Sequence, residues 1–387
     1  MAGKSFTVNW NYPTSVRFGL GRINDLPKEL GTIGVSKPFL ITDSGLVGLP
    51  PFATLKNILD NAKISYEVFS DIKPNPTGKN VEDGVRAYRQ SSCDGVIAFG
   101  GGSALDAGKA IALMIGQTRP LWDFEDVGDN WTRVQIDGMA PCLVIPTTAG
   151  TGSEVGRASV ITNEDEHRKV IIFHPRMMPP VVLADPELTY ALPPSLTAAT
   201  GMDAFSHCLE AYCAPGFHPM AEGIALEGMR LVKEFLPTAF KQGDNAEARA
   251  NMLVASTMGA TAFQKGLGAI HALAHPLGAI YDAHHGMLNA ILMPYVLEAN
   301  ASAIQDKMVR LANHLGLSNP GPQSVIDWVL QLRKTLSIPH TLSEIGIDTS
   351  QAERIANEAV KDPSAGGNPI QYSAKEYESL FTKALTG

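Results

Sequence analysis

The sequence predicts a two-part chain, in which an α/β domain with a parallel sheet is followed by an all-helical domain. Up to about residue 185, short apolar runs alternate with segments of helical periodicity, as expected for a parallel sheet covered by helices on both faces. After Pro193 only helical periodicity remains. The chain has 387 residues, 44% of them apolar and 18% charged, which suffices for two buried cores. We predict domains at residues 1–188 and 189–387, with a cleft between them.

Four strands and three helices are predicted in the first half. Each strand is a short apolar run, and each helix has apolar residues three or four positions apart. The predicted strands are 38–42, 64–69, 95–99 and 142–146, and the predicted helices are 51–62, 80–89 and 103–115. Two later apolar runs, 170–173 and 181–184, are expected either to extend this sheet or to form a small hairpin beside it.

The second half shows helical spacing throughout and no convincing strand. The predicted helices are 198–212, 220–240, 246–264, 288–300, 303–315, 324–336, 350–360 and 374–385. No internal repeat and no low-complexity linker separates the halves, so we expect them to pack closely.

Composition excludes several classes of function. The net charge of −8 offers no general attraction to nucleic acid or to an anionic membrane. No apolar run reaches the ~18 residues of a membrane span, and residues 1–12 lack the apolar core of a signal peptide. The four cysteines form no Cys-x-x-Cys pair and lie in or beside apolar segments, as expected for reduced thiols. We therefore expect a cytoplasmic protein that binds neither nucleic acid nor membrane.

Two segments carry residues that suit a metal site. Asp203 and His207 are four residues apart on one predicted helix, and His271 and His275 are four apart on another, so each pair shares a helix face. An adjacent pair, His284 and His285, follows in a region rich in small residues. One carboxylate with several imidazoles suits Fe(II), Zn(II) or Mn(II) better than Ca(II) or Cu(I). Satisfied core histidines and a local Asp–His hydrogen bond are the alternatives.

Two loops and one carboxylate suit a nucleotide. A triple glycine ends in Ser103 between a strand and a helix, where exposed N–H groups and the helix dipole favour an anion; a plain tight turn is the alternative. A second loop, 146–154, is rich in small hydroxyl side chains. Asp43 ends the first predicted strand, where a carboxylate can bind a ribose 2′-hydroxyl and repel a 2′-phosphate; a turn cap is equally compatible with the sequence.

At these residues the chain resembles the iron-dependent (group III) alcohol dehydrogenases, the family of lactaldehyde reductase and of propanediol and butanol dehydrogenases. The resemblance rests on the segment Gly-Met-Asp-Ala-Phe-Ser-His-Cys-Leu-Glu-Ala-Tyr, the segment His-Ala-Leu-Ala-His-Pro-Leu-Gly-Ala, a later His-Gly, and the pattern Gly-Gly-Gly-Ser-x-x-Asp-x-x-Lys. It covers nearly the whole chain. It implies a Rossmann-like α/β domain joined to a helical domain, as in the dehydroquinate synthase-like fold.

The resemblance also implies roles for individual residues. By position, the metal ligands are Asp203, His207, His271 and His285, with iron expected and zinc possible. His285 is chosen over His284 because it directly precedes Gly286. The resemblance places His275 by the nicotinamide and substrate, as a proton relay or substrate-orienting group. The positions that match the NAD(H)-binding residues are Asp43, Asn75, Gly101, Gly102, Ser103, Thr147, Thr148, Thr151, Lys169 and Leu188.

The expected function is NAD-dependent hydride transfer between a small primary alcohol or diol and its aldehyde or ketone, with the metal as Lewis acid. A hydroxy acid such as 4-hydroxybutyrate is the alternative substrate, with Lys265 or Arg157 as candidate partners for its carboxylate. Phe263 and the segment 122–131 are candidate pocket residues. A metal-dependent lyase, a metal hydrolase and an inactive structural relative are the rival functions. A homodimer or a higher homo-oligomer is expected from the family.

Overall fold

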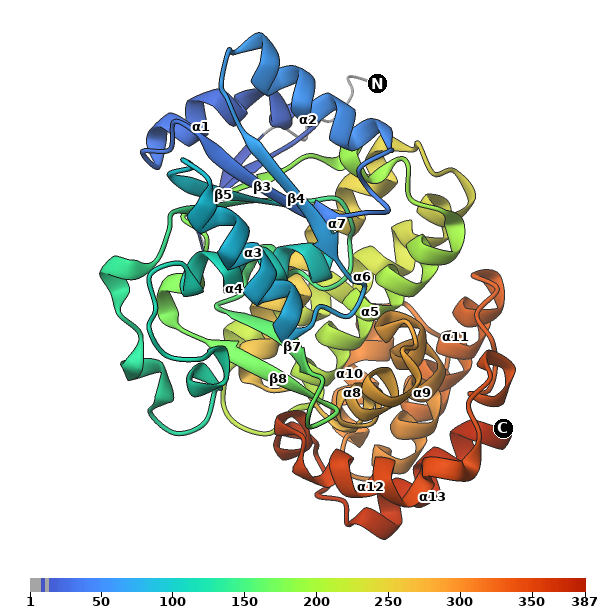
Figure 1. Cartoon of the computed structure of the whole chain (residues 1–387). Helices are drawn as coiled ribbons and strands as arrows, with labels where there is room; N and C mark the ends of the chain where they lie inside the picture. Colours follow the sequence, from blue (N-terminus) through green and yellow to red (C-terminus); the bar gives the residue numbers. More distant parts are fainter. Residues whose placement is uncertain (1–7, 11–13) are drawn as a thin grey trace, which may run out of the picture. The chain divides into compact units, whose positions relative to one another are not determined.

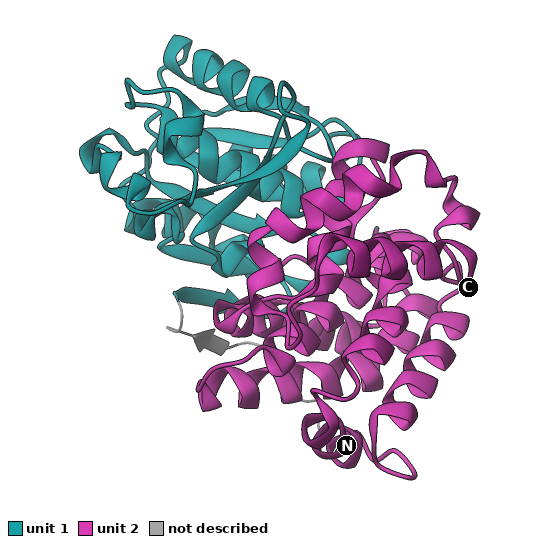
Figure 2. Cartoon of the chain, turned by 90° about the horizontal axis from the view of Figure 1, so that it is seen from below, with its two compact units in different colours: residues 1–148, 152–191 teal, residues 149–151, 192–387 magenta. Residues whose placement is uncertain are grey.

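The computed structural model describes residues 8–10 and 14–387 (Figure 1). Residues 1–7 and 11–13, on which part of the signal-peptide argument depends, lie outside the described residues. The chain divides into two compact units, one of residues 1–148 and 152–191 and the other of residues 149–151 and 192–387 (Figure 2). The division at 191 lies three residues beyond the predicted boundary at 188, and the independence of two domains stays a prediction.

The first unit is built on a seven-stranded sheet with the order β1-β2-β9-β6-β5-β3-β4. In this spatial order, the six strands β2, β9, β6, β5, β3 and β4 pair in parallel with their neighbours. The edge strand β1 pairs antiparallel with β2. The strands are β1 Val8–Trp10, β2 Ser15–Phe18, β3 Pro38–Asp43, β4 Glu67–Ile72, β5 Gly95–Gly100, β6 Cys142–Pro146 and β9 Val181–Ala184. The predicted parallel α/β architecture is therefore confirmed.

Helices cover both faces of this sheet, as Figure 1 shows. Apolar residues of α1 (Leu26–Thr32) and α2 (Pro50–Asn61) form one core with the sheet. Apolar residues of α3 (Gly78–Gln90) and α4 (Gly102–Met114) form the other. A separate antiparallel hairpin, β7 Ala158–Asn163 with β8 Arg168–Phe173, packs on α4. Of the two later apolar runs, the first therefore lies in a hairpin and the second joins the sheet.

The sequence placed one strand too early and missed others. The second predicted strand, 64–69, is found at Glu67–Ile72, because Lys63 takes a left-handed conformation (φ 55°) and the Ile64 N–H group still bonds to the Leu59 carbonyl at the end of α2. The strands β1, β2 and β7 were not predicted: β1 and β2 are short, and all three mix polar with apolar residues.

The second unit is helical wherever it has regular structure in the described residues. Its helices are α5 Pro194–Cys213, α6 Pro219–Lys241, α7 Ala246–Ala262, α8 Ala269–Tyr281, α9 His285–Asn300, α10 Gln305–His314, α11 Pro322–Thr335, α12 Ala352–Lys361 and α13 Ala374–Thr386. The central α5 is buried along most of its length and packs against α6, α7 and α9. Glycines allow this close packing: a Cβ at Gly228 of α6 would lie 2.5 Å from Cys208 Sγ, and a Cβ at Gly259 of α7 3.0 Å from the Ala204 carbonyl.

No helix among the described residues is both long and apolar enough to cross a membrane.

Candidate functional site

Three helices of the second unit bring four potential metal ligands together. Asp203 and His207 lie one turn apart on α5, His271 lies in the first turn of α8, and His285 opens α9. One donor atom from each lies within 4.8 Å of the other three. Asp203 Oδ1 is 3.9 Å from His207 Nε2 and 3.7 Å from His285 Nε2. Two donors of a tetrahedral ion with bonds of about 2.1 Å lie roughly 3.4 Å apart, so these separations approach those of one coordination sphere.

The protonation state of His207 suits a cation. Burial lowers the pKa of His207 to about 4, against the opposing effect of Asp203, so this imidazole is neutral near pH 7. Burial also acts to lower the pKa of His271, but the carboxylates of Glu210 and Asp203 outweigh it and the pKa lies above its ordinary value. Three imidazoles and one carboxylate, nearly all buried, form a nitrogen-rich donor set typical of Fe(II) and Zn(II) sites.

A carboxylate behind the cluster holds one of these ligands. Glu210 Oε2 lies 2.6 Å from His271 Nδ1. The same carboxylate accepts hydrogen bonds from the backbone N–H groups of Gly268 (2.9 Å) and Ile270 (2.7 Å) at the start of α8. Asn368 Oδ1 accepts from the N–H group of Ala269 between them, at 3.1 Å. The N-terminus of α8 is therefore held by one carboxylate and one amide.

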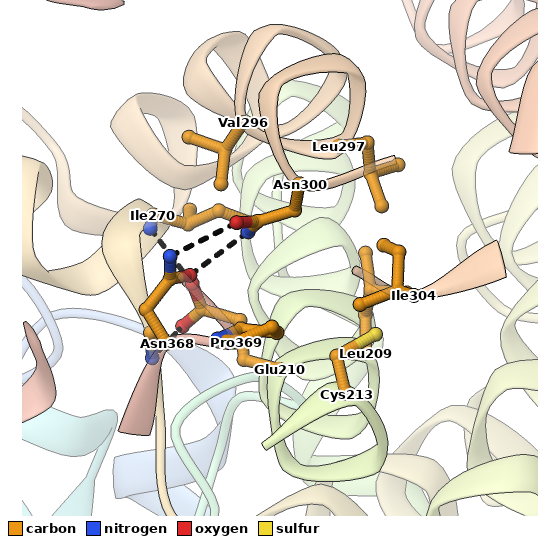
Figure 3. Close-up of a pocket in the computed structure, with 11 residues that line it drawn as sticks. Leu209, Glu210, Cys213, Ile270, Val296, Leu297, Asn300, Ile304, Asn368 and Pro369 are labelled. Carbon is orange, nitrogen blue, oxygen red and sulfur yellow. Dashed lines mark hydrogen bonds between the residues drawn. The ribbon is translucent and has the colours of Figure 1, made fainter. Parts of the chain in front are cut away.

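Glu210, Asn300 and Asn368 are among the residues that line a small cavity, and Figure 3 shows them drawn together. The cavity of about 10 Å³ has room for roughly one water molecule. The amides of Asn300 and Asn368 bond to each other at 2.9 and 3.0 Å, and Tyr372 donates to Asn300 Oδ1 at 2.9 Å. The C-terminal segment is thereby tied to the beginning of α8.

An amide on α9 lies among the donor atoms. Asn289 Nδ2 donates to Asp203 Oδ1 at 2.8 Å and lies 3.2 Å from His271 Nε2 and 3.1 Å from His285 Nε2. Asn289 is fully buried one helical turn after His285. It therefore helps to fix the side chains of the cluster.

His275 lies beside the cluster and not in it. Its Nδ1 is 2.7 Å from Asp362 Oδ2, and its ring stacks on that of His285 with the centroids 5.4 Å apart. Burial acts to raise the pKa of Asp362, but His275 outweighs it and the pKa lies below its ordinary value. His284, whose role the sequence left open, is an exposed residue that precedes α9 and is not among the four donors.

In the first unit, the glycine loop lies between β5 and α4. Gly100 takes a φ of 148°, Gly101 precedes the helix in an extended conformation, and Gly102 is the first helical residue. Gly101 at the N-cap position has no side chain to cap this helix, so the first N–H groups of the helix suit an anion. The Ser103 hydroxyl donates to the carbonyl of Pro74.

Asp43 caps a turn and also borders the glycine loop. Its Oδ1 accepts a hydrogen bond from the Leu46 N–H group at 2.9 Å, which is a turn-capping contact. A Cβ at Gly100 would lie 3.5 Å from its Oδ2, so the carboxylate also borders the glycine loop. A ribose bound at that loop would be within reach of this carboxylate.

The other two polar residues of the glycine motif point inward. Lys109 is 2% exposed and donates to the carbonyls of Ser153 (2.9 Å) and Ala158 (2.5 Å). Asp106 accepts from the Ser153 hydroxyl and from the Val160 N–H group. These two residues hold the chain that follows β6 and are not placed to bind a phosphate.

The remaining predicted cofactor residues have varied surroundings. Thr147 is buried, and its N–H group donates to the Gly100 carbonyl at 2.9 Å, while Thr148 approaches Gly101. Leu188 is a buried core residue, so its side chain already has apolar partners. Three further residues are half-buried on separate segments: Asn75, Thr151 and Lys169.

The candidate pocket residues differ in what they can offer. Phe263 lies beside the cluster, with its ring 5.2 Å from that of His207. Lys265 is unsuited to bind a substrate carboxylate, because its buried amine donates to Glu222 Oε1 at 2.8 Å and faces the Tyr212 carbonyl. Arg157 is exposed and lies over the Phe173 ring in the first unit.

Four residues around the cluster were missed by the sequence reasoning. Glu210 lies three residues after His207, and Asn289 four after His285, so helical spacing could have placed both on the ligand faces. Asp362 and Asn368 lie outside the helices, some 90 residues beyond their partners, and no local pattern marks them.

Comparisons with known proteins show the family of this chain. Residues 13–186 match the profile of the iron-containing alcohol dehydrogenases, and residues 197–385 match the C-terminal profile of the Fe-containing alcohol dehydrogenase family. A 4-hydroxybutyrate dehydrogenase from Cupriavidus necator is 35% identical over 97% of this chain and 99% of its own length.

Solved structures give the same result. The crystal structure of a 1,3-propanediol oxidoreductase superposes with a TM-score of 0.91 and 31% identity, covering 99% of this chain and 100% of that one. A sulfoacetaldehyde reductase from Bifidobacterium kashiwanohense, solved in complex with NAD+, superposes with a TM-score of 0.86 and 27% identity over the whole of both chains. The resemblance seen in the sequence is confirmed: the chain belongs to the iron-containing alcohol dehydrogenase family, and it is an oxidoreductase.

Proposed function

We propose that this protein is an NAD-dependent, metal-dependent alcohol dehydrogenase that interconverts a small primary alcohol or diol and its aldehyde or ketone. The observation that carries the proposal is the convergence of four donor atoms within 4.8 Å, on three helices of a chain from this family. The lyase and hydrolase alternatives lose their support, because the relatives are dehydrogenases and reductases by name.

We assign the metal to Asp203, His207, His271 and His285, with iron as the expected ion and zinc as the alternative. The donor set alone does not separate the two ions, since Zn(II) binds comparable sites at least as tightly. The family name favours iron. A divalent cation at these atoms supplies Lewis acidity, and bound NAD supplies the hydride acceptor for alcohol oxidation.

His275 is the proposed proton-transfer residue. Its Nδ1 is engaged by the ionised Asp362, which leaves Nε2 as the nitrogen that can exchange a proton with the substrate hydroxyl. The stacking of its ring on His285 holds it next to the proposed metal centre.

The proposed cofactor site uses the glycine loop for the pyrophosphate. The open N-terminus of α4 after Gly101 supplies N–H donors, and Ser103 lies in the same turn. The proposal extends to the family-matched positions Asn75, Gly102, Thr147, Thr148, Thr151, Lys169 and Leu188. For buried Leu188 we expect a contact through the backbone.

Replacing Asp43 by serine should relax the preference for NAD over NADP. The carboxylate at this loop repels a 2′-phosphate, and two unit charges about 4 Å apart interact by roughly 1–4 kcal/mol near a protein surface. We expect the ratio of kcat/KM for NADP to that for NAD to rise at least about tenfold, a change worth about 1.4 kcal/mol. Asp60→Ser, on the exposed side of α2, is the control and should leave the ratio unchanged. An unaltered ratio in Asp43→Ser would contradict the assignment.

We expect a neutral substrate. Lys265, the lysine that could have bound a substrate carboxylate, already forms an ion pair with Glu222. The names of similar proteins point both ways, since propanediol is neutral and 4-hydroxybutyrate is an anion. 4-Hydroxybutyrate therefore remains the alternative.

The proposed function is tested by following NADH formation with chelator-treated protein that is then loaded anaerobically with Fe(II) or Zn(II). The panel contains 1,3-propanediol, butan-1-ol and 4-hydroxybutyrate at equal concentrations. We expect metal-dependent NADH formation, faster with the two neutral alcohols. A clear preference for 4-hydroxybutyrate would refute the neutral substrate, and equal rates with and without metal would refute the metal assignment.

A further inference from the structure

The carboxylate of Glu210 has an unusual set of partners. It is 5% exposed and lies next to three N–H donors, those of Gly268, Ile270 and the His271 ring. Its position on α5, one turn after His207, places it one imidazole away from the proposed metal centre. A buried carboxylate needs such donors, because an unpaired charge in the interior is strongly disfavoured.

We infer that Glu210 is a positioning residue that selects the nitrogen with which His271 binds the metal. The inference rests on the proposed metal centre. A carboxylate 2.6 Å from Nδ1 requires the proton to be on Nδ1, and a neutral imidazole then has its single lone pair on Nε2. Nε2 is the nitrogen that lies 3.2 Å from Asn289 Nδ2, on the side of the other ligands.

The local backbone is shaped for this contact. A Cβ at Gly268 would lie 2.9 Å from Glu210 Oε1 and 2.9 Å from Asn368 Oδ1, so only glycine lets both oxygens approach the start of α8. The N–H groups of Gly268 and Ile270 fix the carboxylate, and the carboxylate in turn fixes the His271 ring. The negative charge also lies at the positive end of the α8 dipole.

Charge complementarity with a divalent cation is a second consequence of the position of Glu210. Asp203 and Glu210 together carry two negative charges, which match a divalent cation in a region where both carboxylates are at most 5% exposed. Asp203 would contact the ion directly, whereas Glu210 acts through His271. Its loss would leave the buried centre with an excess positive charge and with a ligand free to change tautomer.

Asn368 provides a matched comparison. Its amide oxygen accepts a hydrogen bond from the Ala269 N–H group in the same turn of α8, and among the described residues its hydrogen bonds go to groups other than the His271 ring. Figure 3 shows Asn368 beside Glu210 and Asn300. Removing Asn368 therefore weakens the anchoring of α8 without changing the partner of the His271 ring. Glu210→Gln keeps the size of the side chain but replaces one acceptor oxygen by an NH2 group. This NH2 group would then face an N–H donor that now binds the carboxylate.

The test compares wild type, Glu210→Gln and Asn368→Ala, with Zn(II) affinity measured by competition with a chromophoric chelator. We expect Glu210→Gln to bind Zn(II) 10–100-fold more weakly, the usual effect of losing such an outer partner. Asn368→Ala should lower the melting temperature yet keep Zn(II) affinity within about threefold of wild type. Unchanged affinity in Glu210→Gln, or an equal loss in Asn368→Ala, would overturn the inference.

A measurement on the wild type keeps the test independent of the folding of the variants. NMR spectra of metal-free protein with isotope-labelled histidine, assigned with His271→Gln, should show the His271 proton on Nδ1. A proton on Nε2 would overturn the inference even if Glu210→Gln failed to fold. If wild-type protein bound no Zn(II), the proposed metal centre itself would be refuted, which distinguishes that failure from a failure of the role of Glu210.

Discussion

Asp203→Ala should abolish metal binding and alcohol oxidation together. Asp203 is the only carboxylate among the four donors, and it also accepts the hydrogen bond from Asn289. Its loss removes the charge that most directly balances a divalent cation and leaves the Asn289 amide without its shortest contact. Loss of an outer partner alone costs 10–100-fold in affinity or activity, so we expect kcat/KM to fall by at least about 100-fold.

The measurement is metal content by elemental analysis together with NADH formation, on protein purified without chelator. Asp327→Ala on the exposed face of α11 is the control and should retain both. A variant without Asp203 that kept its metal but lost activity would place this carboxylate outside the metal site. A variant that kept both would refute the proposed centre.

The helices that carry the cluster could be predicted because their signals are local. Spacings of four residues placed Asp203 with His207 on one face of a helix, and α5 and α8 present these faces as expected. The meeting of three helices at one point could not be derived from spacing, since it depends on the packing of α5 with α9 and of α8 with α9. The family resemblance supplied that part of the argument.

The groups that hold the ligands were harder to predict. Asp362 and Asn368 approach α8 through contacts that span 87 and 99 residues of sequence. Nothing in the sequence around a carboxylate or an amide in a loop shows which distant helix it will contact. Such partners become visible only when the tertiary structure brings the segments together.

For the glycine loop, the sequence predicted the secondary structure well but not the roles of all residues in the motif. Strand, glycines and helix were placed almost to the residue, because glycine and helix-start signals are strong. The same motif includes Asp106 and Lys109, and the sequence could not show that both turn inward to bind the backbone after β6. A single sequence motif can thus combine residues that suit a ligand with residues that stabilise the fold. Cytoplasmic location and the homo-oligomer remain predictions.

Gly286→Ala should separate His285 from the other ligands. Gly286 follows His285 at the start of α9, where a Cβ would lie 2.3 Å from the Ala199 carbonyl oxygen and 3.1 Å from Asp203 Cβ. The oxygen belongs to the backbone of α5 and cannot rotate away, so the methyl group must push α9 from α5. The 3.7 Å separation between His285 Nε2 and Asp203 Oδ1 would then increase.

We expect Gly286→Ala to lower stability by about 1–3 kcal/mol, as overpacking usually does, and to weaken Zn(II) binding at least tenfold. Gly223→Ala is the matched control, because Gly223 is an exposed residue of α6 with no atom within 4 Å of an added Cβ. There the helix should gain roughly 0.5–1 kcal/mol from alanine, with unchanged metal affinity. Melting temperature and chelator competition measure both effects. Full Zn(II) affinity in a destabilised Gly286→Ala protein would mean that His285 does not depend on this contact, and the ligand set would need to be reassigned.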